Sequence, residues 1–309
     1  MTGNLRLGFI GTGIMGTAMA AHLMAAGWEL AVYNRTKAKA APLLERGAHW
    51  AASPQEAAEG ATAVFSIVGG PADVEEVTLG RMGALRGLAP GGIICDMTTS
   101  DPALAERIAA AAGNKGCFAL DAPVTGGDTG ARAASLSFFV GGSQEAYQRL
   151  LPCLRAMGSR ITYFGGPGYG QKAKLANQTA VAGIMFSVCE AMLFAQEEGL
   201  DVERWLELAA AGGAGGRPMA TRGQRILNKD FEPGFFVSHY VKDLNLCLQE
   251  CRRMGIVLPG TALAEQVYRS MQDQGFGRRG TQSLINWLAR FSGRSWHGRA
   301  ALEQRSQDT

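Results

Sequence analysis

The stretch that decides the fold is Gly11-Thr12-Gly13-Ile14-Met15-Gly16, which follows an apolar run at Leu5–Gly11 and opens a helical pattern. Three glycines at this spacing between a strand and a helix are typical of a dinucleotide-binding turn. Gly11 permits the tight turn, Gly13 lets the backbone approach a diphosphate, and Gly16 lets helix and strand pack closely. The diphosphate would bind the free N–H groups at the helix start. We therefore predict that residues 11–16 bind a dinucleotide; the alternative is an ordinary glycine-rich turn.

The end of the second predicted strand, Glu29–Asn34, indicates which dinucleotide binds. An NAD-binding unit would place a carboxylate there to accept hydrogen bonds from the ribose hydroxyls, whereas this chain reads Asn34-Arg35-Thr36. A guanidinium can bind a 2′-phosphate through two hydrogen bonds, and a carboxylate would repel it. NADP is therefore expected in preference to NAD, with Asn34, Arg35 and Thr36 as contacts. The alternative is that Arg35 is only a solvated charge.

The first 165 residues alternate strand-like runs with helical patterns. Strands are expected at Leu5–Gly11, Glu29–Asn34, Ala63–Val68, Gly91–Met97, Cys117–Val124 and Leu136–Gly141. Several of these runs are continuously apolar, which is typical of a parallel sheet covered by helices on both faces. The fold class is therefore α/β, a Rossmann-type doubly wound sheet. We place Val68, at the end of the third strand, among the cofactor contacts.

The pattern changes after Gly165-Gly166-Pro167-Gly168, beyond which strand signals are absent. A long helix that is apolar nearly all round is expected from Gly170 to about Gly199, joining the two domains. Shorter amphipathic helices follow at Val202–Ala211, Arg217–Asn228, Asp243–Met254, Gly260–Gln274 and Gln282–Phe291. We expect a nucleotide-binding domain over 1–166, an all-helical substrate and oligomerisation domain over 167–309, and a polar, loosely held tail at Ser292–Thr309.

Composition excludes several classes of protein. Apolar residues make up 47% of the 309 residues, charged residues 18%, and the net charge is +3, so neither a disordered chain nor a nucleic-acid binder is indicated. The chain has no run of 18 apolar residues without a break and no signal peptide pattern at its start, so no membrane association is expected. Six cysteines, mostly within apolar segments, indicate reduced thiols and a cytoplasmic protein. No metal site is expected.

Two further clusters carry polar groups suited to catalysis. Thr125-Gly126-Gly127 follows a predicted strand, where a hydroxyl and open backbone N–H groups could bind a carboxylate, although a simple turn fits equally well. Lys174 begins the long helix, with Asn177 and Gln178 on the same face. Burial would lower the pKa of such a lysine toward the range useful for proton transfer. The alternative for Lys174 is a side chain that reaches solvent at a domain boundary.

These clusters, in this order, resemble the β-hydroxyacid dehydrogenases, the family that contains 3-hydroxyisobutyrate dehydrogenase, tartronate semialdehyde reductase and glyoxylate/succinic semialdehyde reductases. The resemblance covers residues 5 to 292. Its motifs are Gly8–Gly16, Asp96–Pro102, Asp121–Gly127, Gly168–Gln178, and Asp230–Phe235 with Lys242-Asp243.

The resemblance implies a role for each matching residue. Lys174 is similar to the family's catalytic lysine, and Asn177 and Gln178 stand in the substrate-contacting positions that follow it. Thr125, Gly126 and Gly127 match the loop that holds the substrate carboxylate. Thr99 matches a contact near the nicotinamide ribose, Lys242 matches a cofactor contact from the helical domain, and Asn34–Thr36 looks like the NADP-preferring members.

The chain departs from the family pattern at several positions. The family commonly has serine at Thr125, a second asparagine at Gln178, and Gly-Thr-Leu where this chain reads Ala134-Ser135-Leu136. An acidic residue common before the last helix is missing from Arg278–Gln282. Apart from the threonine, which keeps its hydroxyl, these changes bear on the substrate's identity more than on the reaction.

The expected function is NADP-dependent interconversion of a small β-hydroxyacid and its semialdehyde or ketoacid, with Lys174 and Asn177 as catalytic residues. The expected partner is a small carboxylate-bearing substrate, and the apolar interdomain helix indicates a homodimer or homotetramer. An imine reductase or a 6-phosphogluconate dehydrogenase-like enzyme shares this architecture, but Lys174 and the compact Thr125–Gly127 loop disfavour imine reduction. A non-catalytic NADP-binding protein is the alternative from another class; it would need neither Lys174 nor Thr125.

Overall fold

The computed structural model describes residues 6–299, and these form two compact units that divide between Ala176 and Asn177. In the first unit, strands form one sheet in the order β3-β2-β1-β4-β5-β6-β8-β7, with β9 paired to β8. The strands are β1 (Arg6–Ile10), β2 (Glu29–Tyr33), β3 (His49–Trp50), β4 (Ala63–Ser66), β5 (Ile93–Asp96), β6 (Phe118–Asp121), β7 (Val124–Thr125), β8 (Leu136–Gly142) and β9 (Gly158–Gly165).

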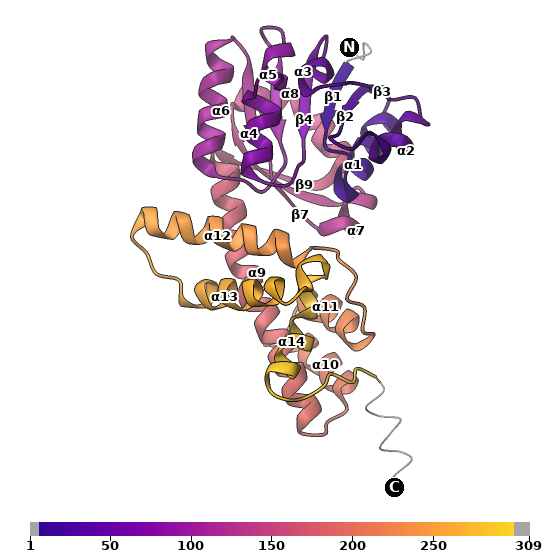
Figure 1. The fold of residues 1–309 in the computed structure, drawn as a ribbon, viewed down its shortest axis with the longest axis vertical. Coiled ribbons are helices and arrows are strands. Elements are labelled where there is room, and N and C mark those ends of the chain that lie inside the picture. The colour runs from indigo at the N-terminus through magenta and orange to yellow at the C-terminus, as the bar shows by residue number, and fades with distance from the viewer. Residues whose placement is uncertain (1–5, 300–309) are drawn as a thin grey trace. The chain divides into compact units, whose positions relative to one another are not determined.

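Helices cover both faces of this sheet. One face packs against α3 (Pro54–Ala58), α4 (Pro71–Leu79), α5 (Ala84–Gly87) and α6 (Pro102–Asn114); Figure 1 shows α4 and α6 side by side over the strands. The other face packs against α1 (Ile14–Ala25), α2 (Ala41–Leu44), α7 (Gly127–Arg132) and α8 (Gln144–Met157). The predicted doubly wound α/β class is confirmed.

The prediction of a parallel sheet is wrong for one expected strand. Strands β1 to β6 pair in parallel, but β8 runs antiparallel to both β6 and β7. The link between β6 and β8 holds only the two-residue β7 and the six-residue α7, so no long crossover helix carries the chain back to the same end of the sheet. The edge strand β9, parallel to β8, was not predicted either, because its few apolar residues do not form a continuous run and half of its residues are exposed.

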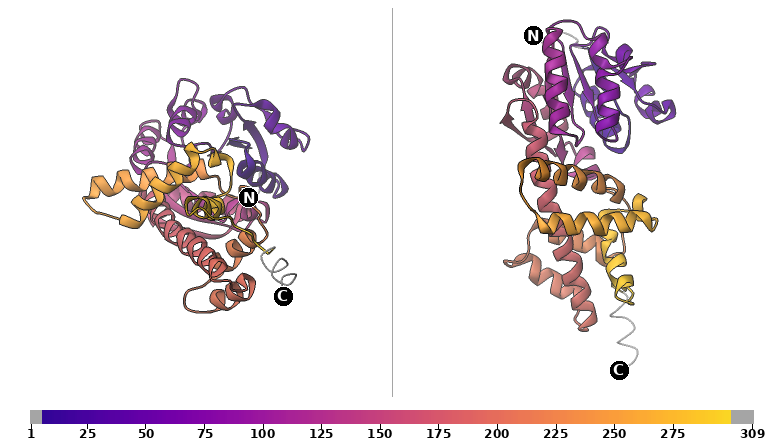
Figure 2. Two further views of the ribbon diagram at one scale, coloured as in Figure 1. Left: turned by 60° about the horizontal axis from the view of Figure 1, so that its bottom comes forward. Right: turned by 60° about the vertical axis from the view of Figure 1, so that its left-hand side comes forward.

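The second unit is helical over residues 177–299. It contains most of α9 (Tyr169–Glu197), then α10 (Val202–Ala211), α11 (Arg217–Leu227), α12 (Val237–Met254), α13 (Pro259–Asp273) and α14 (Leu284–Phe291). Figure 1 and the right-hand view of Figure 2 show α12 and α13 side by side. Helix α12 begins six residues before the predicted Asp243, since its N-cap Phe236 makes no side-chain cap hydrogen bond that a sequence pattern could signal.

Part of the predicted loose tail is packed instead. The Trp296 side chain is buried in the core of the second unit, and its indole Nε1 donates to the Ile226 carbonyl at 3.1 Å. The His297 N–H donates to Gln196 Oε1 at 2.8 Å. The prediction was wrong for this segment because it weighed the polar composition of the tail and overlooked a single tryptophan; residues 300–309 lie outside the described range.

Helix α9 is long and apolar enough, by length and composition alone, to cross a membrane. Its most apolar window has a mean hydropathy of 1.5, and 39% of that window is buried. The middle of the same helix contributes Met185, Cys189 and Met192 to the core of the second unit. A core helix of this kind meets the same criteria.

Close packing of α1 on β1 gives a first testable prediction. A Cβ atom on Gly16 would lie 1.8 Å from the Gly11 carbonyl oxygen, whereas a Cβ on Gly13 would meet nothing within 4 Å. Overpacking of this kind is costly, so Gly16→Ala should lower the free energy of unfolding by about 2 kcal/mol or more. Gly13→Ala, the matched control, should lower it by less than about 1 kcal/mol. Urea unfolding followed by circular dichroism measures both, and equal effects would contradict this packing.

Candidate active site

The glycine turn between β1 and α1 leaves a helix N-terminus open. Gly11 has a φ of +97°, and its N–H donates to the Tyr33 carbonyl on β2 at 2.9 Å. Gly13 is the N-cap of α1 and provides no side-chain cap hydrogen bond, and it is exposed. The first N–H groups of α1 are thus available to an anion. The Thr12 hydroxyl is buried and has no hydrogen-bond partner within residues 6–299.

The end of β2 holds this turn through Asn34. Its Oδ1 accepts from the Thr12 N–H at 3.0 Å, and its Nδ2 donates to the Thr36 carbonyl at 2.9 Å. The neighbouring Arg35 is 88% exposed, and its Nη1 lies 3.6 Å from Asp73 Oδ1 on α4. The sequence analysis missed Asp73 because it belongs to a distant helix. An exposed ion pair of this kind is weak, so a phosphate could replace the carboxylate as the partner of Arg35.

A buried carboxylate organises the ends of β4 and β5. Asp96 Oδ1 accepts from the hydroxyls of Ser66 and Thr98, each at 2.8 Å. Thr98 Oγ1 in turn accepts from the Val68 N–H at 3.0 Å. Asp96 thereby fixes the segment that carries Thr99 beside the segment that carries Val68, two of the predicted cofactor contacts. Sequence reasoning quoted Asp96 only as part of a motif.

The Thr125–Gly127 loop lies where β7 meets α7. Thr125 pairs with Ser137 of β8 and is half-buried, while Gly126 is exposed with a φ of +127°. Gly126 is the N-cap of α7 and makes no side-chain cap hydrogen bond. The hydroxyl and the backbone N–H groups therefore belong to one turn. The nearby charge of Asp128 is paired with Arg132 at 2.6 Å.

The first turn of α9 is capped by Asp121, at the end of β6. Its Oδ1 accepts from the Gly168 N–H at 2.9 Å, and its Oδ2 accepts from the Gln171 N–H at 2.8 Å. A Cβ on Gly170 would lie 2.3 Å from the Asp121 carbonyl oxygen, and only glycine allows so close an approach. Burial raises the pKa of Asp121 to about 6, although the two N–H donors oppose this rise.

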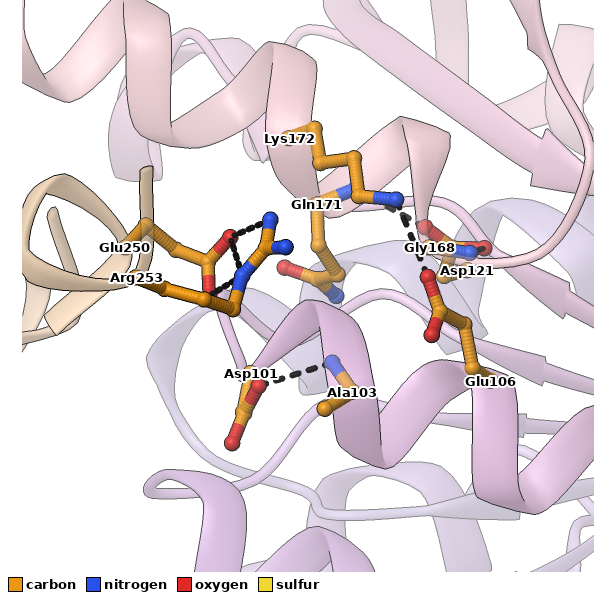
Figure 3. Close-up of polar contacts among 9 residues, drawn as sticks. All are labelled: Asp101, Ala103, Glu106, Asp121, Gly168, Gln171, Lys172, Glu250 and Arg253. Atoms are coloured by element: carbon orange, nitrogen blue, oxygen red, sulfur yellow. Dashed lines mark hydrogen bonds and ion pairs between the residues drawn. The ribbon is translucent and has the colours of Figure 1, made fainter. Parts of the chain in front are cut away.

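Lys174 and Lys172 lie in different surroundings on α9. Lys174 is buried, with 5% of its surface exposed. Lys172 is half-buried, and its Nζ lies 2.9 Å from Glu106 Oε1 on α6 and 4.7 Å from the centre of the Tyr169 ring. Figure 3 shows Lys172 reaching Glu106 beside the Asp121 cap. Lys174 is therefore the more deeply buried of the two lysines.

In the second unit, a chain of polar side chains joins predicted site residues. Asn177 Nδ2 donates to Gln178 Oε1 at 2.9 Å, and Gln178 Nε2 donates to Asp243 Oδ2 at 2.6 Å. Asp243 is 2% exposed, and its Oδ1 lies 2.9 Å from Lys242 Nζ. The Tyr240 hydroxyl donates to the Gln178 carbonyl at 3.1 Å. The structure thus brings Asn177, Gln178 and Lys242 together through Asp243, to which sequence reasoning gave no role.

The arrangement fits a dinucleotide and a proton-transfer step. Within residues 6–299, the N-terminus of α1 is open, the Thr12 hydroxyl has no partner and there is space around Gly13, and these features suit a diphosphate. A buried lysine one turn before an oriented amide can hold and deliver a proton to a substrate oxygen. These features define an NAD(P)-binding oxidoreductase.

Comparisons with known proteins give the family within this class. Residues 6–165 match the NAD binding domain of 6-phosphogluconate dehydrogenase, and residues 168–288 match the family described as NAD-binding of NADP-dependent 3-hydroxyisobutyrate dehydrogenase. The chain is 49% identical over 290 residues to "Probable 3-hydroxyisobutyrate dehydrogenase-like 1, mitochondrial" of Arabidopsis thaliana, which covers 94% of this chain and 86% of the relative. It therefore belongs to the β-hydroxyacid dehydrogenase family, as the motifs indicated.

Two other similar proteins support this assignment. The 2-hydroxy-3-oxopropionate reductase of Escherichia coli is 36% identical over 284 residues, which cover 92% of this chain and 97% of that protein. The solved structure of Psf3 in complex with NADP+ and 2-OPP has a TM-score of 0.84 at 27% identity, covering 91% of this chain and 99% of that one. The relatives indicate NAD(P)-dependent hydroxyacid dehydrogenase activity.

The raised pKa of Asp121 predicts a pH-dependent contribution to stability. The folded state holds this proton up to about pH 6, whereas the pKa of an aspartate in the unfolded chain has its ordinary value of 3.8. The contribution is therefore present below pH 3.8 and lost as pH rises through 6, a change of about 3 kcal/mol. Relative to Asp121→Asn, the wild-type free energy of unfolding should fall by most of this amount between pH 4 and pH 7. Urea unfolding at each pH measures the free energy of unfolding of both proteins. If this free energy changes with pH by the same amount in wild type and in Asp121→Asn, the raised pKa of Asp121 is contradicted.

Proposed function

We propose that this protein interconverts a small β-hydroxyacid and its semialdehyde or ketoacid by hydride transfer with NADP(H). The observation that carries the proposal is the burial of Lys174, which is 5% exposed and lies one helical turn before Asn177 on α9. Such a desolvated ammonium group can exchange a proton with the reacting oxygen of a substrate. A non-catalytic nucleotide-binding protein would gain nothing from burying this charge.

Substrate binding, proton transfer and orientation of the substrate are assigned to separate residues of this chain. When bound, the dinucleotide supplies or accepts the hydride. The Thr125 hydroxyl and the N–H groups of Gly126 and Gly127 bind the substrate carboxylate. Lys174 Nζ donates a proton to the carbonyl oxygen during reduction and takes it back during oxidation. Asn177 orients that oxygen.

Gln178 acts through its neighbours in this proposal. Both ends of its side-chain amide are engaged, one with Asn177 and the other with Asp243, and the residue is 2% exposed. We propose that Gln178 orients the Asn177 amide and, as its place after the lysine implies, can also contact the substrate. Lys242, which forms an ion pair with the same Asp243, is the proposed cofactor contact of the second unit.

The proposed preference for NADP rests on Arg35. Its exposed guanidinium follows the strand end at which NAD-binding units carry a carboxylate. Its partner Asp73 is itself 44% exposed, so the pair can separate at little cost when a dianionic phosphate binds. Cytoplasmic localisation, absence of a nucleic-acid or membrane partner, and assembly as a homodimer or homotetramer are also kept as proposals.

Removal of the lysine tests the proton-transfer role. Lys174→Ala should lower kcat by roughly 10²–10⁴-fold, the usual scale for losing a general acid, with NADPH affinity nearly unchanged. Lys172→Ala is the matched control, since Lys172 lies two residues away and pairs with Glu106 at the surface. Steady-state kinetics on a panel of 3-hydroxyisobutyrate, glycerate, glyoxylate, succinic semialdehyde, serine and threonine measures both. Unaltered turnover in Lys174→Ala would remove Lys174 from the mechanism.

A second variant tests the cofactor assignment. Arg35→Ala should lower the preference for NADPH over NADH by about tenfold or more, since a charge-assisted bidentate contact is lost. Lys39→Ala, another exposed cation on the segment after β2, should leave the preference within twofold. The ratio of kcat/KM values for the two cofactors is the readout. The same ratio in wild type and Arg35→Ala would refute the role of Arg35.

A further inference from the structure

Gln171 joins the first turn of α9 to the segment that carries Thr99. Its Oε1 accepts from the Ser100 N–H, and its Nε2 donates to the Thr98 carbonyl, each at 2.8 Å. Its own backbone N–H is one of the two donors to Asp121. The residue is completely buried, with 0% of its surface exposed. All of these contacts lie within the first unit.

The two side-chain hydrogen bonds of Gln171 go to Thr98 and Ser100, the residues immediately before and after Thr99. Thr99 is the proposed contact near the nicotinamide ribose, and Lys174 lies three residues after Gln171, on the same face of α9. One side chain thus connects the segment that would hold the cofactor's reacting end with the helical turn that carries the proton donor. A misplacement of about 1 Å between reacting groups can cost about 10²-fold in rate.

We propose that Gln171 is a positioning residue that holds Lys174 in register with Thr99 for the hydride and proton transfers. The inference rests on the proposed function. Glutamine suits this role because its amide offers one acceptor to the Ser100 N–H and one donor to the Thr98 carbonyl. Neither bond can be replaced by water without opening the packing, because the site is closed to solvent.

The chain offers a matched control in Lys172. Its ion pair with Glu106 also ties the first turn of α9 to α6, but it is partly exposed and does not involve residues 98–100. Figure 3 shows the side chains of Gln171 and Lys172 leaving the helix in different directions. A change at Lys172 therefore loosens the helix start without breaking the link to Thr99.

Two substitutions at Gln171 separate positioning from structure. Gln171→Met keeps the side-chain volume but removes both hydrogen bonds. Gln171→Glu mimics the amide only while it is protonated, since a carboxylic acid has one donor and one acceptor whereas a carboxylate would face the Thr98 carbonyl with a lone pair. The charged groups near Gln171 in the first unit include Asp96, Asp101, Glu106, Asp121, Lys172 and Lys174. The kcat of each variant is therefore divided by the wild-type kcat at the same pH, so that the titration of these charged groups cancels.

The experiment measures kcat and substrate KM for wild type, Gln171→Met, Gln171→Glu and Lys172→Met between pH 5.5 and 9. We expect Gln171→Met to lower kcat by about 10- to 100-fold at every pH, with KM changed less than about threefold. Gln171→Glu should show the same loss at high pH and recover toward wild-type kcat as pH falls. Lys172→Met should stay within twofold of wild type.

The outcomes are distinct. If wild type is active but Gln171→Met matches Lys172→Met, Gln171 has no positioning role while the proposed function stands. Should Gln171→Met not fold, a constant ratio of Gln171→Glu to wild-type kcat across the pH range overturns the inference, and recovery at low pH supports it. If wild type turns over no substrate of the panel, the proposed function fails and the inference fails with it.

Discussion

The hydrogen bonds from the start of α9 to the Asp121 carboxylate are the constraint on which the candidate site depends. They fix the helix at the carboxyl end of β6, and the side chains of Gln171 and Lys174 follow within one turn. The close approach requires glycine at 170, where any Cβ would meet the backbone of β6 and β8. A buried carboxylate is costly in free energy, but a helix N-terminus is one of the few places where backbone donors satisfy it. The position of the candidate active site is thus set by the Asp121 cap of α9 and not by a binding loop.

The same principle recurs at the neighbouring strand. Asp96 pairs in register with Asp121 across β5 and β6, and it is satisfied by hydroxyl and N–H donors of Ser66 and Thr98. Each acid holds a loop at the edge of the sheet where ligands of open α/β folds bind. In the second unit, Asp243 holds two side chains in a similar way, because it accepts a hydrogen bond from Gln178 and forms an ion pair with Lys242. Three buried aspartates, Asp96, Asp121 and Asp243, therefore hold the segments that carry the residues proposed to contact the cofactor and the substrate.

Much of this could be predicted from sequence because the signals were local. The glycine turn, the strand runs and the long apolar helix follow from spacing and hydrophobicity within one segment, whereas the sequence left open whether Lys174 is buried or reaches solvent. The antiparallel β8, the pairing of Arg35 with Asp73 and the burial of Trp296 depend on contacts between segments distant in sequence, which no local pattern encodes. The sequence showed Asp121 and Asp243 only as parts of motifs, because the residues with which they form hydrogen bonds lie in another element, α9.

The central claim is that this chain transfers a hydride between NADPH and a small hydroxyacid pair. The most direct measurement incubates the protein with NADPH deuterated at the transferable position and each carbonyl acid of the substrate panel, then analyses the hydroxyacid products by mass spectrometry. The account predicts one deuterium on the carbinol carbon of at least one product. Tight NADPH binding with no deuterium in any product would contradict it.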